Sequence, residues 1–418
     1  MARFATLDAW LDWQQTLSPK EIVLGLERVQ AVGDRLDLLR PRCPVIAVAG
    51  TNGKGSVVAL LEAMFGAAGY RVGAFTSPHL LRYNERVRIS GAAVDDAVLC
   101  EAFACIDEAR GDIPLTYFEF GTLAALHAFT AAAVDVMVLE VGLGGRLDAV
   151  NAVASDVAVV TTIDLDHADW LGSDRESIGR EKAGIMRPRR PVVCGDRHPP
   201  VSLLEHAEKI GADLRLLGRD FEVERRDEGM RWSDGSVALE LPPPALHGRF
   251  QFDNAATALA ALTAVGARLP VDAEACAEGL RSVRVAGRYQ RLPGTPPVFC
   301  DVAHNPQAAQ ALASILRDEA VPGRTLTVFA ALGDKDIEAI AGELDAEVAH
   351  WFVAGLDAPR GLDAESLAAR MKACLAPLTC HADVASALAA ARAAARPGDR
   401  ILVCGSFLTV AAALAASL

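Results

Sequence analysis

The sequence lacks the features that mark disulfide-stabilised or nucleic-acid-binding proteins. Its nine cysteines are scattered and form no C-x-x-C pair, so neither a disulfide framework nor a thiolate zinc site is indicated. No block of Lys and Arg offsets the formal net charge of −13, and a chain of that charge repels a phosphate backbone over long range. We therefore expect no nucleic acid partner and a reducing, cytoplasmic location.

Long apolar runs are missing as well. The N-terminal segment is interrupted by Arg3, Asp8 and Asp12, which excludes the continuous apolar stretch of a signal peptide. The most apolar window, residues 401–418, is divided by a Gly-Ser pair into a strand-like run and an Ala-rich helical run. A buried strand and helix are expected there, and no membrane partner.

What is present is typical of a folded protein with two domains. The chain has 418 residues, of which 51% are hydrophobic and 23% charged, and a chain of this length usually divides into two cores. Helical periodicity gives way to Gly- and Pro-rich sequence between residues 281 and 294. We therefore expect an N-terminal domain of residues 1–286 and a C-terminal domain of residues 287–418.

The first half alternates short apolar runs with helical patterns. Residues 45–49, 134–141 and 157–163 are strand-like, and 121–133 is helix-like, which predicts an α/β domain with a parallel sheet. Residues 213–241 are expected to form a small β-rich excursion with a hairpin turn at Asp234-Gly235.

The second half alternates more regularly and predicts a Rossmann-like, doubly wound α/β domain. The predicted strands are 298–302, 325–331, 350–354 and 400–404, and the predicted helices are 308–319, 337–344, 364–375, 384–395 and a final helix.

A glycine-rich string follows the strand at 45–49 and opens a helix. In that context the glycines let backbone N–H groups converge on phosphate oxygens, and a lysine reaches the β- and γ-phosphates. The string predicts an ATP site within an N-terminal P-loop ATPase-like domain. Its proposed contacts are Thr51, Asn52, Gly53, Lys54, Gly55 and Ser56.

Two further polar residues end strand-like runs. Glu140 stands between an apolar run and a glycine-rich turn, and His167 follows the run that ends near residue 163. Polar groups at the carboxyl ends of parallel strands meet at one edge of the sheet. Mg²⁺ needs only a few oxygen ligands from a protein, so Glu140 is a candidate ligand, whereas a lone histidine is open to a packing or capping role.

The loop G-T-N-G-K-G-S departs from the standard P-loop spacing and resembles the version found in the Mur ligase family. Further strings resemble the folylpolyglutamate synthase branch of that family, and the similarity runs from about residue 25 to 407. These strings are T-S-P-H-L at 76–80, N-E-R-V at 84–87, E-V-G-L-G-G-R-L-D at 140–148, D-H at 166–167 and R-E-K-A-G-I at 180–185.

The resemblance implies roles for residues that the pattern alone leaves open. It implies two Mg²⁺ sites, with Ser77, Glu140 and His167 as ligands, and a carbamylated Lys182 that carries oxygen ligands to the metal. For ATP it implies contacts with Asn254, with Arg288 on a phosphate, and with Asp301 near the ribose. His304 would lie beside them, so the catalytic group would be Lys54, Lys182 and His304.

The pterin-side segments of such enzymes are also represented. By resemblance the substrate contacts are Leu24, Gly25, Arg28, Thr116, Phe118, Leu147, Asp148 and Ala149. Val23 stands where close relatives often carry Asp, which departs from the family pattern.

The predicted activity is an ATP- and Mg²⁺-dependent ligation of L-glutamate to dihydropteroate and to tetrahydrofolate through an acyl phosphate, by a monomer. The alternatives are a folylpolyglutamate synthase only, a cell-wall amino-acid ligase, and a P-loop module without ligase activity. A Rossmann oxidoreductase is disfavoured because the glycines at 142–145 lack the G-x-G-x-x-G spacing. The base that deprotonates the amine, the glutamate chain length and its linkage stay open.

Overall fold

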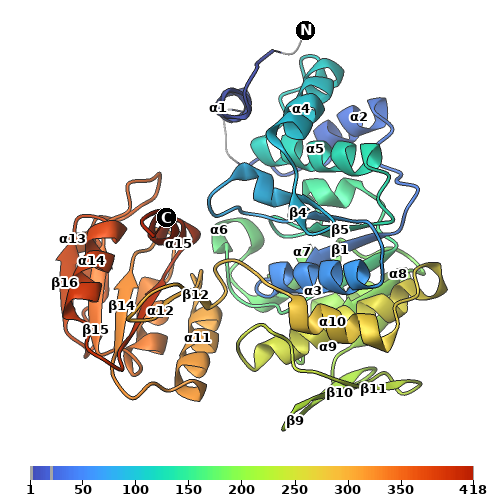
Figure 1. Cartoon of the computed structure of the whole chain (residues 1–418). Coiled ribbons are helices and arrows are strands. Elements are labelled where there is room, and N and C mark those ends of the chain that lie inside the picture. Colours follow the sequence, from blue (N-terminus) through green and yellow to red (C-terminus); the bar gives the residue numbers. More distant parts are fainter. Residues whose placement is uncertain (1–2, 19–21, 418) are drawn as a thin grey trace. The chain divides into compact units, whose positions relative to one another are not determined.

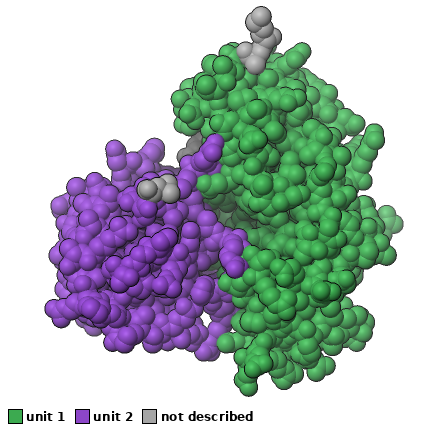
Figure 2. All heavy atoms as spheres, in the orientation of Figure 1, with its two compact units in different colours: residues 1–79, 83–245, 251–283 green, residues 80–82, 246–250, 284–418 purple. Residues whose placement is uncertain are grey.

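The computed structural model describes residues 3–18 and 22–417. Residues 1–2 of the N-terminal segment and the last residue of the 401–418 window lie outside the described residues. The chain forms two compact units, drawn in different colours in Figure 2. Unit 1 comprises Met1–His79, Tyr83–Ala245 and Gln251–Val283, and unit 2 comprises Leu80–Arg82, Leu246–Phe250 and Arg284–Leu418.

Unit 1 is built on an eight-stranded sheet of order β4-β3-β2-β5-β1-β6-β7-β8. Six neighbouring strands are parallel, and β3 and β4 add an antiparallel edge. The central strands are fully buried, as expected where helices cover both faces. The strands are β1 Val45–Ala49, β2 Val72–Phe75, β3 Val87–Ile89, β4 Ala92–Ala93, β5 Val136–Glu140, β6 Val157–Val160, β7 Pro191–Cys194 and β8 Asp213–Leu216.

Helices cover both faces of this sheet, with α4 and α5 on one side and α3 and α10 on the other (Figure 1). Gly279 of α10 lies directly against Met64 of α3, where a Cβ would come within 2.6 Å of the methionine Cγ. The α-helices are α1 Leu7–Leu17, α2 Glu27–Arg35, α3 Lys54–Ala67, α4 Asp96–Arg110, α5 Tyr117–Ala131, α6 Ala168–Leu171, α7 Arg175–Ala183, α8 Val201–Ile210, α9 Phe250–Val265 and α10 Ala273–Ser282. Short 3-10 helices are η1 Tyr83–Arg86, η2 Ala149–Ala152 and η3 Gly266–Arg268.

The predicted β-rich excursion is a three-stranded antiparallel sheet of β9 Glu222–Arg226, β10 Gly229–Ser233 and β11 Ala238–Leu241. The indole Nε1 of Trp232 donates to the carbonyl oxygen of Ala256 at 3.2 Å, which anchors the sheet on α9. The turn at Asp234-Gly235 is confirmed. The predicted start at residue 213 was wrong, because β8 pairs in parallel with β7 and completes the main sheet.

Unit 2 contains a six-stranded sheet of order β12-β13-β17-β14-β15-β16, antiparallel only at β12. Two hydrophobic clusters draw on alternate residues of its strands, so both faces are covered and the Rossmann-like prediction is confirmed. The strands are β12 Gln290–Leu292, β13 Val298–Cys300, β14 Thr325–Phe329, β15 His350–Ala354, β16 Leu378–His381 and β17 Arg400–Cys404. The helices are α11 Pro306–Asp318, α12 Ile337–Asp345, α13 Ala364–Arg370, α14 Val384–Ala394 and α15 Phe407–Ala415.

The sequence analysis missed two strands here, β12 and β16. A helix was predicted to continue to residue 375, but α13 ends at Arg370 and β16 lies between it and α14. This edge strand is partly or fully exposed along its length, so it lacks the apolar run that identifies buried strands. The prediction of a strand and a helix at 401–418 is confirmed, and among the described residues no helix has both the length and the apolar character needed to cross a membrane.

Candidate functional site

The phosphate loop joins β1 to α3 through a backbone that needs glycine. Gly50 and Gly53 have φ of +151° and +87°, in the region that residues with a Cβ rarely adopt. A Cβ at Gly53 would stand 2.6 Å from Oδ1 of Asn254, and one at Gly50 would overlap the hydroxyl of Thr161. Asn254 therefore lies directly against the loop.

The carboxyl end of β6 holds the loop in place. The amide of Thr51 donates to the carbonyl oxygen of Thr162 at 2.6 Å. The hydroxyl of Thr161 donates to the carbonyl oxygen of Asn52 at 2.6 Å. Sequence reasoning did not select Thr161 or Thr162, although their place after a buried strand was a usable signal.

Lys54 is the first residue of α3. Its Nζ donates to the carbonyl oxygens of Gly50 and Thr51, both at 3.1 Å. The ammonium group thus lies over the loop that would receive the phosphates.

Ser56 and Asn254 are linked through a residue that the sequence analysis missed. The side-chain amide of Gln251 donates to the buried Ser56 hydroxyl at 3.4 Å and accepts from Asn254 Nδ2 at 2.8 Å. Gln251 and Asn254 lie one turn apart on α9. That spacing was the available signal for Gln251.

Glu140 ends β5 and is buried, with 4% of its surface exposed. Its Oε2 accepts from the amide of Ser77 at 3.3 Å and would lie 3.8 Å from a Cβ at Gly55. Glu140, the Ser77 backbone and the loop therefore meet at one place. A buried carboxylate beside a phosphate loop suits a hard cation such as Mg²⁺.

His167 adopts a positive φ of +51° just before α6. Its side chain is 40% exposed, and its Nε2 lies 3.9 Å from Oδ1 of Asp166. Over residues 3–18 and 22–417, no three His, Cys, Asp or Glu side chains gather as a metal cluster. The structure therefore brings Glu140 to Ser77 and places His167 beside Asp166.

Lys182 lies on α7 and is buried, with its Nζ donating to the carbonyl oxygen of Gly50 at 2.8 Å. Burial lowers the pKa of Lys182 to about 7, and repulsion from Lys54 acts in the same direction, while Asp166 and Asp148 oppose it. Close to neutral pH a large fraction of the amine is therefore uncharged.

The predicted pterin-side segments come together in unit 1. Arg28 pairs with Glu119 at 2.8 Å, and Glu119 forms a capping box with Thr116 at the start of α5. The amide of Gly25 donates to the carbonyl oxygen of Leu147 at 3.4 Å. Leu24 is partly buried near this contact.

Val23 contributes a carbonyl oxygen that accepts from Arg28 at 2.7 Å. The backbone at position 23 thus holds Arg28 whichever side chain it carries.

Asp148 is buried and accepts three backbone hydrogen bonds, from Gly142 at 3.1 Å, Leu143 at 2.9 Å and Val150 at 3.0 Å. Burial raises its pKa to about 6, and these bonds oppose the rise. The ring of Phe118 covers Gly142, where a Cβ would come within 2.7 Å. Asp148 therefore shapes the glycine turn, and the buried Ala149 continues from it as the first residue of η2.

Three predicted residues lie near one another in unit 2. Asp301 is buried and accepts from the amides of Tyr289 and Ala303, both at 2.8 Å. Burial raises its pKa, and the positive charge of Arg288 opposes the rise.

Arg288 and His304 both approach the ring of Phe407 in unit 2. The Arg288 guanidinium lies 5.8 Å from the ring centre, and the imidazole of His304 lies 5.9 Å from it. The Nδ1 of His304 is 2.8 Å from the carbonyl oxygen of Val302. Because a carbonyl only accepts, this nitrogen carries a proton.

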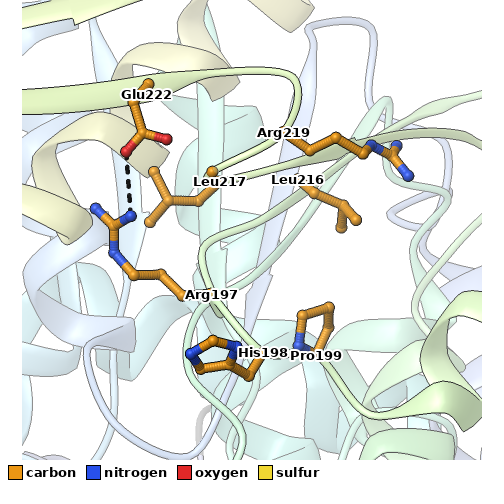
Figure 3. A pocket seen from close by; sticks show the side chains of 8 residues that line it. Arg197, His198, Pro199, Leu216, Leu217, Arg219 and Glu222 are labelled. Atoms are coloured by element: carbon orange, nitrogen blue, oxygen red, sulfur yellow. Dashed lines mark hydrogen bonds and ion pairs between the residues drawn. The ribbon is translucent and has the colours of Figure 1, made fainter.

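A separate pocket of about 350 Å³ lies beside the small sheet and contains none of the predicted site residues. Figure 3 shows the Arg197 guanidinium directed at Glu222, with their ion pair at 3.1 Å. Arg197 also pairs with Asp253 at 2.7 Å, the residue before Asn254. These pairs tie β9 to the helix that carries Asn254.

Comparison with known proteins places this geometry in a family. The model of the Mur ligase middle domain matches residues 48–262, and the model of the Mur ligase glutamate ligase domain matches residues 287–407. The dihydrofolate synthase/folylpolyglutamate synthase of Escherichia coli (strain K12) is 47% identical over 406 residues, covering 97% of this chain and 94% of the relative.

Solved structures agree. Escherichia coli FolC in complex with DHPP and ADP superposes with a TM-score of 0.94 at 46% identity, covering 98% of this chain and 97% of that one. A bifunctional folylpolyglutamate synthase/dihydrofolate synthase with Mn, AMPPNP and L-glutamate bound superposes with a TM-score of 0.91 at 46% identity. The superposition covers 99% of this chain and 98% of that one. The chain belongs to the Mur ligase family, in its dihydrofolate synthase/folylpolyglutamate synthase branch.

Proposed function

We propose that this chain is an ATP- and Mg²⁺-dependent ligase that joins L-glutamate to dihydropteroate and extends tetrahydrofolate by further glutamates. The observation that carries the proposal is the meeting of a phosphate loop, Lys54 and the buried Glu140 at the carboxyl edge of a parallel sheet. The names and bound ligands of the similar proteins support it.

We assign the nucleotide to the loop of residues 51–56 together with Asn254, and we assign Arg288 to a phosphate and Asp301 to the ribose. Residues 1–286 would form the ATP-binding domain and 287–418 the glutamate-ligase domain. The positive φ values at Gly50 and Gly53 support the assignment of the loop, because a glycine-rich turn that opens a helix is typical of a phosphate site.

Ser77 and Glu140 would hold one Mg²⁺, and His167 with a carbamylated Lys182 would hold a second. When bound, the metal would offset negative charge on the phosphates. The pKa of about 7 at Lys182 supports carbamylation, because only the neutral amine can bond to the carbon of CO₂, with loss of one N–H proton. The buried ammonium that would otherwise face the metal is then replaced by an anion.

The substrate carboxylate is a poor electrophile, so it must be activated before an amine can attack it. A substrate carboxylate oxygen attacks the γ-phosphorus, the bond to the β-phosphate oxygen breaks, and ADP leaves. The amine of glutamate then attacks the acyl carbon, phosphate departs, and the amine gives up a proton. Lys54 stabilises charge on the transferred group by position rather than by covalent chemistry.

The pterin would lie against the segments that carry Leu24, Gly25, Arg28, Thr116, Phe118 and Leu147 to Ala149. The contacts between Arg28 and Glu119 and between Gly25 and Leu147 support a shared pocket, because they bring these segments together. His304, which lies two residues after Val302 and bonds to its carbonyl oxygen, is our candidate for handling the amine proton. We further propose that the protein is a monomer in the cytoplasm, a reducing compartment in which the free thiols of the described cysteines persist.

The test is release of phosphate from Mg-ATP that depends on both glutamate and a pterin, measured with dihydropteroate and with tetrahydrofolate separately. UDP-muramoyl substrates should give none. Lys54→Ala is expected to lower turnover at least a hundredfold, as loss of a charge-stabilising donor does, with an unchanged far-ultraviolet circular dichroism spectrum. Phosphate release without glutamate, or a wild-type rate for Lys54→Ala, would refute the proposal.

A further inference from the structure

The N-E-R-V string at residues 84–87 has no role in the site described so far. It includes the end of η1 and the start of β3. The amide of Thr76 donates to the carbonyl oxygen of Arg86 at 2.9 Å. Arg86 is therefore next to the residue before Ser77, close to the proposed metal and phosphate site.

The guanidinium of Arg86 is held in a fixed orientation. Its Nε donates to Nδ1 of His79 at 2.8 Å. Its central carbon lies 5.4 Å from the ring centre of Tyr83 and 5.5 Å from that of Tyr117, and the two rings are nearly perpendicular, at 88°. Stacking on aromatic rings suits the flat guanidinium and fixes its plane.

The charge of Arg86 is not neutralised by the protein. In the part of the chain that the structure describes, its side chain has the one hydrogen bond to His79 and pairs with no carboxylate. Two other arginines of unit 1 differ, since Arg88 pairs with Glu62 at 2.8 Å and Arg28 pairs with Glu119 at 2.8 Å. Arg86 is also partly buried, where an uncompensated charge is costly.

We propose that Arg86 binds a carboxylate of the substrates, using the terminal nitrogens that His79 leaves unoccupied. A guanidinium fork fits a carboxylate in a bidentate pair. Tyr117, which stacks on Arg86, stands between Thr116 and Phe118 of the proposed pterin pocket. Arg86 thus lies between that pocket and Ser77, where a carboxylate must be oriented for attack on the γ-phosphorus. This inference rests on the proposed function.

Two carboxylates have the required chemistry, the benzoate carboxylate of dihydropteroate and a carboxylate of glutamate. The first test measures KM for each in wild type, Arg86→Lys and Arg86→Met. Loss of a charge-assisted bidentate pair should raise one KM by roughly 10- to 100-fold, while the dissociation constant for AMPPNP is unchanged. Lysine keeps the charge without the fork, so Arg86→Lys should recover only part of the loss.

The second test removes the carboxylate from the ligand. Calorimetry compares dihydropteroate with its carboxamide, and glutamate with its amides, in the wild type and in Arg86→Met saturated with Mg-AMPPNP. If Arg86 binds the benzoate carboxylate, the variant should lose affinity for dihydropteroate but not for the carboxamide. If Arg86 instead binds a carboxylate of glutamate, the variant should lose affinity for glutamate but not for the amide in which that carboxylate is replaced. Equal losses for acid and amide with both ligands would overturn the proposal.

Arg88→Lys is the matched control, because Arg88 lies on the same segment and already has Glu62 as its partner. It should leave both KM values within twofold of wild type. The circular dichroism spectrum and the melting temperature of both variants show whether Arg86→Met is folded. A folded Arg86→Met that binds its substrate weakly has lost a binding contact and is not misfolded. If the wild type itself forms no glutamate-dependent phosphate, the proposed function fails first; if it is active and Arg86→Met binds both acids normally, only this inference fails.

Discussion

The protonation state of Lys182 links the site to stability. The amine is charged in the unfolded chain up to its ordinary pKa of 10.5, whereas burial lowers the folded value to about 7. Between these values the unfolded state binds more protons, so the stability contributed at this position rises with pH. Below pH 7 the folded protein bears the full cost of a buried ammonium.

We predict that Lys182→Met stabilises the metal-free protein most at pH 6, by a few kcal/mol, on the order expected for a shift of this size. The gain should shrink steadily between pH 7 and pH 10. Urea unfolding in EDTA at several pH values measures it. A gain that is the same at every pH would contradict the shifted pKa.

Gly53 is required in the phosphate loop because a residue with a Cβ would not fit at this position. Its φ of +87° and the nearby Asn254 both exclude a side chain. Gly66, in the same helix α3, has open space around its Cβ position.

Gly53→Ala is expected to weaken AMPPNP binding at least tenfold, because Asn254 or the loop must move. Gly66→Ala should keep nucleotide affinity and add about 0.5–1 kcal/mol of stability. Equilibrium nucleotide titration and urea unfolding of both variants provide the comparison. Equal affinity in the two variants would argue against a nucleotide on this loop.

At the scale of elements, α1 is packed by aromatic contacts around the fully buried Trp10. The same helix face carries Gln14, which is 1% exposed, and neither polar atom of its amide has a hydrogen-bond partner among the residues that the structure describes. Leaving such atoms unpaired costs free energy that an apolar residue would not.

Gln14→Leu should therefore raise the free energy of unfolding by about 1–3 kcal/mol. Gln15→Leu, one residue along on the exposed side, should change it by less than about 0.5 kcal/mol. Chemical denaturation with an unchanged m value measures both. A less stable Gln14→Leu would mean that the amide has an internal partner, such as a buried water.

Prediction from sequence succeeded for elements with local signatures. The strand predicted at 45–49, the glycine loop and the helix after it are adjacent in the chain. One short stretch of sequence therefore contained the whole strand–loop–helix motif. The edge strand β16 was missed, because half-exposed strands carry no apolar run. Gln251 was missed because its contact with Ser56 forms only in the folded chain, and its spacing from Asn254 was the one signal in the sequence. The roles of Arg288 and Asp301 were inferred from the family resemblance. Both are predicted to contact ATP, so measuring nucleotide affinity in variants of either residue tests them.

At the scale of the whole molecule, each unit has its own hydrophobic core. Calorimetry should therefore resolve two unfolding transitions in the ligand-free protein. Mg-AMPPNP at 100 times its dissociation constant should stabilise the unit that contains the phosphate loop by about 2.7 kcal/mol. A single transition that nucleotide does not shift would contradict both the division and the assigned site.

The resting position of Lys54 has a consequence for selectivity among the anions of the cell. Because two of the three N–H groups of its ammonium donate to carbonyl oxygens of its own loop, an incoming anion that is to bind more than one of these N–H groups must replace at least one of those bonds. Chloride has one charge to offer in exchange, whereas a polyphosphate brings several strong acceptor oxygens. We therefore expect the loop to bind nucleotides more tightly than the abundant monovalent anions.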